Sequence, residues 1–166
     1  MKCIKKLVAL TLAAVLALTM LTACGSTPSV PETTEETKQI VDNINAVRTE
    51  NGLPALEINT AVTDVAQKYL ALKEKKELNL ISEEDYNKAW NEVRSIQVAG
   101  KLHSYYIVMT SLTQSGEKSM TKKFWQEEYD GKYGVSRIVS DAGTKYVGIA
   151  MKQISNGKFV TAVVSY

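Results

Sequence analysis

The sequence contains few of the side chains that most often carry catalysis or bind transition metals. Its single histidine is His103, and its two cysteines, Cys3 and Cys24, both lie near the N-terminus. One histidine cannot supply the group of imidazoles that usually holds zinc. No Gly-x-Ser-x-Gly segment marks a nucleophile elbow that His103 could serve. We therefore predict no catalytic residue, no metal ligand and no cofactor, and we expect His103 to be a partly exposed residue where a loop meets a strand.

Glycine-rich phosphate-binding loops are also missing. Two groups of acids remain as candidates for paired catalytic carboxylates, Glu127–Glu128 and Glu83–Asp85. A glycosidase needs such a pair. However, both groups are expected on helix surfaces or in first turns, where acids favour solubility and the helix dipole. The acids therefore do not indicate a glycosidase.

No apolar run in the sequence is long enough to cross a membrane as a helix. The longest, Leu7–Leu21, has about 15 residues, whereas a spanning helix needs about 20. Lys2, Lys5 and Lys6 precede this run, and small residues follow it. This order of charged, apolar and small residues is typical of a signal peptide.

The segment Leu21-Thr22-Ala23-Cys24 is similar to the lipobox of bacterial lipoproteins, in which the cysteine thiol receives a diacylglycerol and the preceding peptide bond is cleaved. We therefore predict that residues 1–23 are a lipoprotein signal peptide and that Cys24 is the lipidated first residue of the mature chain. Two or more acyl chains anchor a protein stably, so the predicted location is the extracytoplasmic side of the cell membrane. A retained transmembrane anchor and an ordinary secretory peptide cleaved elsewhere are the alternatives.

Removal of this signal peptide changes the charge balance. Three of the 20 Lys and Arg lie in it, which leaves 17 against 18 Asp and Glu and a formal net charge of −1 instead of +2. No basic excess remains to attract nucleic acid.

With Cys3 removed and Cys24 acylated, no thiol is left for catalysis or a disulfide. Residues 24–38 are polar and poor in apolar side chains, which predicts a flexible tether ahead of a domain at residues 39–166.

Apolar residues at helical spacing predict three helices in the first half of this domain. Thr33 and Glu36 form a capping box at the start of the first helix. Asn59 or Thr60 caps the second helix, and Ser82 starts the third. The inward positions are Ile40, Val41, Ile44 and Val47 in the first helix, Val62, Val65, Ala66, Tyr69 and Leu72 in the second, and Tyr86, Ala89, Trp90 and Val93 in the third.

The second half of the domain is predicted to form an antiparallel sheet. Its strands are the segments rich in aromatic and β-branched residues, 104–110, 145–152 and 158–166, with a fourth helix at 117–129 between the first two. Asn156-Gly157 suits the positive φ angles of a type I′ hairpin turn. Helices followed by antiparallel strands make an α+β fold.

Three segments together resemble the CAP (SCP) domain of bacterial secreted proteins. The family's first helix ends in the pattern N-x-x-R-x-x-x-G-L-x-x-L, which is met by Asn45, Arg48, Gly52, Leu53 and Leu56. Residues 60–69 are similar to the second helix of the family, and residues 146–151 and 159–164 are similar to its closing hairpin. The resemblance covers residues 38–166 and implies a three-layer α-β-α sandwich with a central antiparallel sheet.

The sequence departs from the family at its best-known site. Members often carry two histidines and two acidic residues around a central cleft. Here no histidine follows Tyr69 along the second helix, Val98–Ser104 contains no Gly-Glu-Asn, and Tyr133–Val139 has no histidine in place of the family's Gly-His-Arg. The resemblance therefore implies a degenerate member without this tetrad, and none of its residues or metal ligands is carried over.

We predict a cell-envelope lipoprotein whose CAP-like domain binds a lipid, peptide or protein partner without catalysis. Eight Tyr and two Trp against two Phe favour recognition, because these rings carry a polar group. Trp90 and Trp125 are predicted to pack helices onto the sheet, and Tyr105 and Tyr106 to point to opposite faces of their strand. The alternatives are an envelope hydrolase for peptide or cell-wall material and a structural lipoprotein without a small ligand. No ligand-binding residue can be named from the sequence.

Overall fold

A computed structural model of the chain describes residues 34–110, 120–132, 134 and 136–166. The predicted signal peptide at residues 1–23, Cys24 and most of the predicted tether lie outside these residues. All described residues belong to one structural unit, Thr33–Tyr166. Within this described part, no helix has the length and apolar character needed to cross a membrane.

Four strands form the main sheet in the order β1-β5-β6-β4, and β2 and β3 form a separate hairpin. The elements along the chain are α2 (Glu35–Glu50), β1 (Glu57–Ile58), α3 (Thr60–Glu77), α4 (Glu83–Arg94), β2 (Gln97–Val98), β3 (Lys101–Leu102), β4 (Ser104–Thr110), α6 (Lys122–Tyr129), α7 (Arg137–Ser140), β5 (Tyr146–Gln153) and β6 (Phe159–Ser165). The long strands β5, β6 and β4 pair antiparallel, as predicted, whereas the short β1 adds to β5 in parallel. The sheet is therefore mixed at one edge only.

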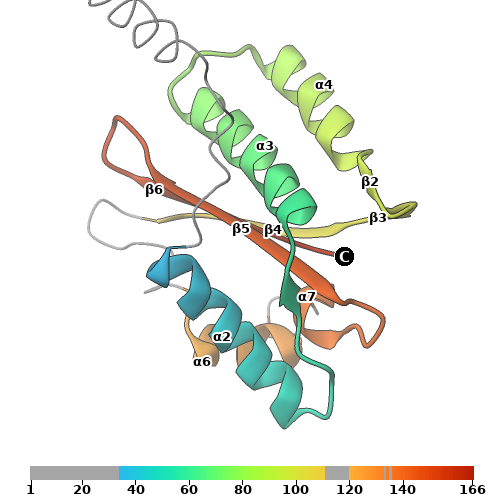
Figure 1. Cartoon of the computed structure of the whole chain (residues 1–166). Coiled ribbons are helices and arrows are strands. Elements are labelled where there is room, and N and C mark those ends of the chain that lie inside the picture. Colours follow the sequence, from blue (N-terminus) through green and yellow to red (C-terminus); the bar gives the residue numbers. More distant parts are fainter. Residues whose placement is uncertain (1–33, 111–119, 133, 135) are drawn as a thin grey trace, which may run out of the picture. The chain divides into compact units, whose positions relative to one another are not determined.

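Helices cover both faces of this sheet (Figure 1). α3 and α4 lie on one face, and α2, α6 and α7 lie on the other. Alternating side chains of the same strand serve the two layers: in β5, Val147 and Ile149 pack with α2, whereas Ala150 packs with α3. Tyr106 and Tyr105 of β4 likewise pack into opposite layers. The predicted α+β fold and three-layer α-β-α sandwich are confirmed.

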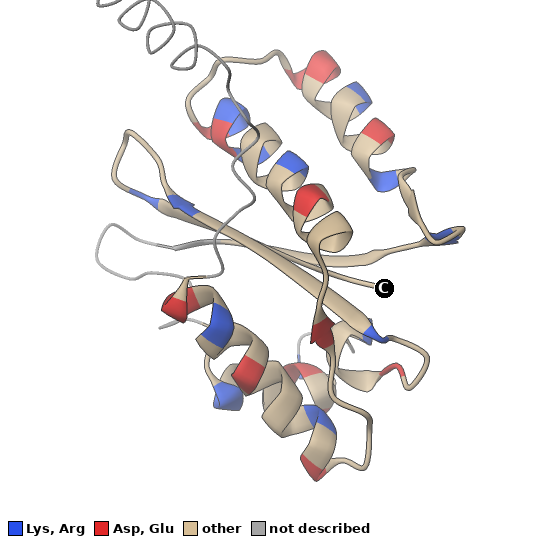
Figure 2. Ribbon diagram, in the orientation of Figure 1, with Lys and Arg blue, Asp and Glu red and all other residues tan. Residues whose placement is uncertain are grey.

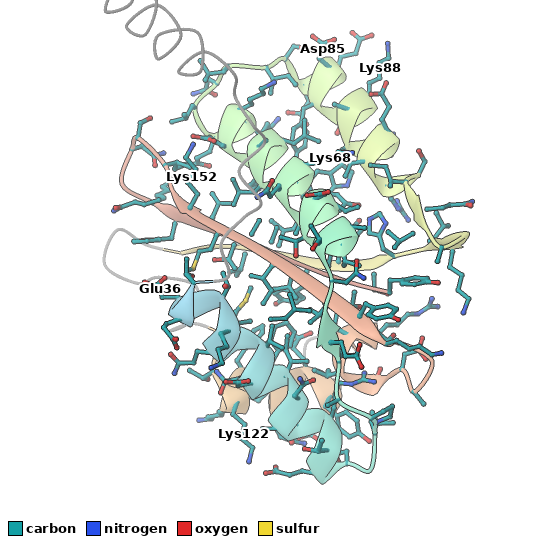
Figure 3. The ribbon with its side chains drawn as sticks, viewed as in Figure 1. Glu36, Lys68, Asp85, Lys88, Lys122 and Lys152 are labelled. Carbon is teal, nitrogen blue, oxygen red and sulfur yellow. The ribbon has the colours of Figure 1, made fainter. Side chains whose placement is uncertain are left out.

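Charged residues lie on the helices and toward the ends of the long strands, and the central parts of these strands carry none (Figure 2). Lys152 of β5 forms an ion pair with Glu74 of α3 at 2.8 Å, and Lys122 of α6 pairs with Glu50 of α2. Figure 3 labels the two lysines. Such surface pairs contribute little to stability. Burial of the apolar sheet faces therefore holds the layers together.

The helix starts agree only partly with the predictions. Asn59 and Ser82 cap α3 and α4 through their side-chain oxygens, as predicted. α2 is capped by Thr34, one residue after the predicted Thr33, which lies outside the described residues. Two adjacent threonines are equally able to cap, so the sequence could not select between them. The fourth helix begins later than the predicted residue 117, because Thr121 provides the cap of α6.

The β5–β6 hairpin is present, but its turn is not the predicted type I′ turn. That turn needs a positive φ at both central residues. Gly157 has a φ of 84°, but Asn156 is not among the positive-φ residues, and Gly157 N–H donates to the carbonyl of Ile154 at 2.8 Å. This is the geometry of a three-residue loop with a glycine bulge. Positive φ angles at both central positions occur instead in the unpredicted β2–β3 hairpin, at Ala99 (48°) and Gly100 (78°).

Arg48 joins α2 to two later parts of the chain. The residue is 0 % exposed. Its guanidinium donates to the carbonyl oxygens of Pro54, Ile138, Asp141 and Thr144 at 2.8–3.2 Å. Burial lowers the pKa of Arg48 and the nearby Asp141 carboxylate raises it, but a guanidinium stays charged at any ordinary pH. Arg48 is therefore a structural residue that the fold surrounds with acceptors.

The neighbouring residues of the same sequence pattern close the end of α2. The Asn45 amide pairs with both backbone groups of Leu56, donating to its carbonyl at 3.0 Å and accepting from its N–H at 2.7 Å. Gly52 has a φ of 74°, and Leu53 N–H donates back to the carbonyl of Arg48 at 2.8 Å. Only glycine adopts this φ without strain. The pattern that suggested a family is thus explained by helix termination and not by ligand binding.

Gly148 of β5 lies directly beneath the start of α3. A Cβ atom on Gly148 would lie 2.2 Å from the backbone nitrogen of Thr63 and 2.3 Å from the carbonyl carbon of Val62. Both atoms belong to the helix backbone, which cannot rotate away as a side chain could. Glycine at this position therefore sets how closely α3 approaches the sheet.

Candidate functional site

An aromatic cluster fills the space between α3, α4 and the first residues of β4. Its members are Tyr69, Tyr86, Trp90, His103 and Tyr105. The Tyr69 ring is central, with its centroid 4.9 Å from that of Trp90 and 4.8 Å from that of Tyr105. Tyr69 is 0 % exposed. The predicted inward position of Tyr69 and the predicted packing role of Trp90 are confirmed.

His103 is held at both ring nitrogens. Nδ1 lies 3.0 Å from the carbonyl oxygen of Ile96, and Nε2 lies 2.9 Å from the hydroxyl of Tyr69. Because a carbonyl only accepts, Nδ1 must donate, and in the neutral ring Nε2 then accepts from Tyr69. Burial lowers the pKa of His103, although the Ile96 bond raises it, and burial raises the pKa of Tyr69. The ring is therefore neutral at pH 7, at the partly exposed loop-to-strand junction that was predicted.

This geometry predicts that acid weakens the fold through His103. The pKa of His103 in the folded chain lies below the ordinary value of 6.5. The unfolded chain therefore binds the proton first as pH falls below about 6.5, and stability is lost from there down to the folded pKa. We expect His103→Gln to show a shallower loss of unfolding free energy than the original chain between about pH 7 and pH 5, measured by urea denaturation. Parallel pH profiles of the two proteins would contradict this role.

A cleft of about 630 Å³ opens beside His103 at the start of β4. Its lining residues are Arg94, Leu102, His103, Ser104, Tyr105, Tyr106, Glu128, Gly134, Ser136 and Arg137. β4 is the end strand of the sheet, and these residues come from both of its faces. α4 and the β2–β3 hairpin contribute from one layer, and α6 and α7 contribute from the other. We call this space the β4 cleft.

Glu128 is a buried acid in the wall of the β4 cleft. It is 2 % exposed, and the Tyr106 hydroxyl donates to its Oε1 at a long 3.4 Å. Burial raises the pKa of Glu128, and the Tyr106 bond only partly offsets this. The expectation that Glu127 and Glu128 both occupy a helix surface is thus wrong for Glu128. Glu128 follows the buried Trp125 by three residues and so shares the inward face of α6, a signal that the sequence did contain.

Two arginines and several hydroxyls in or beside this cleft have few partners among the described residues. Arg94 ends α4 and Arg137 begins α7, and both are exposed. No hydrogen bond or ion pair joins either guanidinium to another residue in the described ranges. Ser136 makes no capping bond to α7. The buried hydroxyl of Ser165, whose register partner is the cleft residue Ser104, is also without a hydrogen-bond partner in the described structure.

The polar groups of the β4 cleft differ in how far they already bond to other parts of the fold. His103 directs both nitrogens at Tyr69 and Ile96, so neither faces a serine hydroxyl. Among the residues that the structure describes, no group of three or more His, Cys, Asp or Glu side chains could hold a metal ion. The cleft offers donors from two arginines and two serines, and Glu128 as an acceptor. Sequence reasoning named none of these as ligand-binding residues, because they come from four separate segments.

Comparison with known proteins gives one family. The model of the cysteine-rich secretory protein family, CAP, matches residues 41–166. No curated protein matches the chain. Among solved structures, an outer surface protein from Borrelia burgdorferi is similar, with 15% identity and a TM-score of 0.48 over 81% of this chain and 93% of that one. The family match extends from within α2 to the end of β6 and covers most of the chain. The chain therefore belongs to the cysteine-rich secretory protein (CAP) family, as the sequence patterns suggested.

Proposed function

We propose that this CAP-family protein is held on the extracytoplasmic side of the cell membrane by a lipid on Cys24 and binds a ligand, without catalysis, in the β4 cleft. One observation carries the binding role: the residues of this cleft include charged groups that do not stabilise the fold. Such groups are typical of functional sites. The volume of the cleft, about 630 Å³, lies in the range of small-molecule sites and also suits the end of a peptide.

Glu128 is one charged group of the cleft that does not stabilise the fold. Its pKa is raised in the folded chain. A group with a raised folded pKa stabilises the fold at low pH, and this contribution is lost as pH rises through the folded pKa. At neutral pH an ionised Glu128 therefore works against folding. A glutamine of the same shape would avoid this cost, so the fold alone does not account for an acid at this position.

A catalytic role has less support. A general base must lie within hydrogen-bond reach of the proton that it removes. His103 is neutral, as a base would be, but its Nε2 accepts from the buried Tyr69 hydroxyl at 2.9 Å. It would have to break this bond before it could act on a substrate.

The binding role can be tested by mapping fragment binding on the full chain, purified in detergent, by ¹H–¹⁵N NMR. We expect neutral and charged fragments to shift the amide signals of Ser104, Glu128 and Ser136 rather than those of α3. Fragments that shift only signals remote from β4 would contradict the proposal. A hydrolytic turnover that disappears in His103→Ala would also contradict it and would favour the hydrolase alternative.

The membrane anchor depends on one thiol. Cys24→Ala removes the acceptor of the diacylglycerol, so we expect the variant to be absent from the detergent-extracted lipoprotein fraction. Intact-mass measurement of the original protein should show a chain that begins at Cys24 and carries acyl groups. Cys3→Ala is the matched control and should leave both results unchanged, because Cys3 is removed with the signal peptide. An original protein whose N-terminus is uncleaved and unmodified would overturn the anchor.

A further inference from the structure

We propose that the β4 cleft recognises an oxyanion of its ligand, a carboxylate or a phosphate group, and that Arg94 and Arg137 hold this group from the two helical layers. This inference rests on the proposed binding function and adds the chemical class of the ligand. Arg94 comes from the layer of α3 and α4, and Arg137 from the layer of α2, α6 and α7 (Figure 1). A ligand seated at the end of β4 would therefore meet a guanidinium on each side.

The use of arginine in this chain supports a dedicated role. The sequence contains 17 lysines but three arginines. Arg48 is buried among carbonyl groups, and the other two arginines both line the β4 cleft. Lysines lie elsewhere on the surface, for example the exposed Lys68 of α3 and Lys88 of α4 (Figure 3). Arginine differs from lysine in its planar fork of donors, which matches the two oxygens of a carboxylate or phosphate.

Both guanidiniums remain available to a ligand. Several surface lysines pair with acids, for example Lys152 with Glu74 at 2.8 Å. Arg94 and Arg137 have no such partner among the described residues. Glu128 is the one carboxylate among the described residues that line the cleft. A nearby guanidinium would lower the pKa of this carboxyl, whereas burial raises the pKa of Glu128. The arginines are therefore not neutralised from within the cleft.

Hydroxyl groups of the cleft could also donate hydrogen bonds to an oxyanion. Ser136 directly precedes Arg137, and its side chain is not used to cap α7. Ser104 lines the cleft from β4, beside its register partner Ser165 on β6, whose buried hydroxyl has no hydrogen-bond partner in the described structure. Hydroxyl donors beside a guanidinium are common partners of oxyanions. Together they form a donor-rich site in which an anionic group gains more hydrogen bonds than a neutral one.

Titration calorimetry on the full chain in neutral detergent tests this inference. Three probes are compared at constant ionic strength: an N-acetylated dipeptide with a free C-terminal carboxylate, the same dipeptide as its C-terminal amide, and inorganic phosphate. We expect the amide to bind at least about tenfold more weakly than the better of the two anions, because it lacks the charge-assisted bonds. Stronger binding of the carboxylate assigns a peptide or other acid as the source, and stronger binding of phosphate assigns a phosphorylated ligand.

Variants then identify the groups responsible. Arg94→Ala and Arg137→Ala should each weaken anion binding by about tenfold or more, and Arg94→Lys should not restore it, because lysine lacks the fork. Glu128→Gln should strengthen binding, since it removes a negative charge without changing shape. Lys68→Ala, on the outside of α3, is the control and should change nothing (Figure 3). Thermal unfolding of each variant checks that the fold is intact.

The outcomes separate this inference from the proposed function. Equal binding of the acid and its amide, or arginine variants that bind the anions as well as the original chain, would overturn the oxyanion site. If neutral fragments still shift the cleft signals in the NMR experiment, the binding function stands and only the ligand class is wrong. If no probe of either kind binds in the cleft, both proposals fail.

Discussion

Arg48→Met is expected to lower the free energy of unfolding by about 3–5 kcal/mol. Methionine has a similar length and stays in the core, but it donates no hydrogen bond. The carbonyls of Ile138 and Thr144, to which Arg48 makes fully buried bonds, would then be without a partner. An unsatisfied buried polar group costs about 1–3 kcal/mol, and the bonds to Pro54 and Asp141 are lost as well. Small domains are stable by only about 5–15 kcal/mol, so the variant should be largely unfolded at moderate urea concentrations.

The matched control for this prediction is Arg94→Met. Arg94 is exposed, and its guanidinium has no hydrogen bond to another residue in the described part of the chain. Its replacement should change the unfolding free energy by less than about 0.5 kcal/mol. Arg48→Lys should fall between the two, because an ammonium keeps the charge but cannot reach all four carbonyls. A loss below about 1 kcal/mol in Arg48→Met would show that water or local rearrangement satisfies the carbonyls, and would contradict the structural role.

Gly148→Ala is expected to lower the free energy of unfolding by about 3 kcal/mol, at the upper end of the usual cost of overpacking. The added methyl group would lie 2.2–2.5 Å from three backbone atoms of Val62 and Thr63. These atoms can move only if the start of α3 moves away from β5. Such a shift would open the contact that buries Val62, Val65 and Ala66 against the sheet. Urea denaturation measures the loss.

Gly143→Ala is the control for this substitution. A Cβ atom at Gly143 would lie 3.2 Å from the side-chain Oδ1 of Asp141, which can rotate away. Its cost should therefore be well below that of Gly148→Ala. Because α3 also carries Tyr69, displacement of the helix should weaken the Tyr69–His103 bond, and the amide signal of His103 should shift. A stable Gly148→Ala protein with an unchanged His103 signal would contradict the close approach of α3 and β5.

The inward face of α3 and the caps of α3 and α4 were predictable because they depend on residues close together in the sequence. The spacing of Val62, Val65 and Tyr69 along α3 identified an inward face, and Asn59 identified its start. The turn at Asn156-Gly157 was placed correctly but given the wrong geometry, because the same dipeptide also fits a three-residue loop. Local sequence therefore located the elements more reliably than it described their backbone.

The pattern from Asn45 to Leu56 suggested the family, but not what its residues do. Three of the four carbonyls that Arg48 binds belong to α7 or to the segment between α7 and β5, far along the sequence from α2. No local rule connects an arginine in one helix with acceptors that distant. The layered fold brings them together, because α2 and α7 cover the same face of the sheet.

The amino-acid sequence by itself determined the fold class, the family, and the prediction that Cys24 carries a lipid, because each depends on short patterns of polarity and residue type. Only the tertiary structure decided the site. Arg94, Glu128 and Arg137 lie on three different helices, and the end strand β4 is the element around which they meet. Side chains become buried only when helices cover both faces of the sheet. The raised pKa of Glu128 and the hydrogen bond between His103 and Tyr69 therefore depend on the tertiary structure.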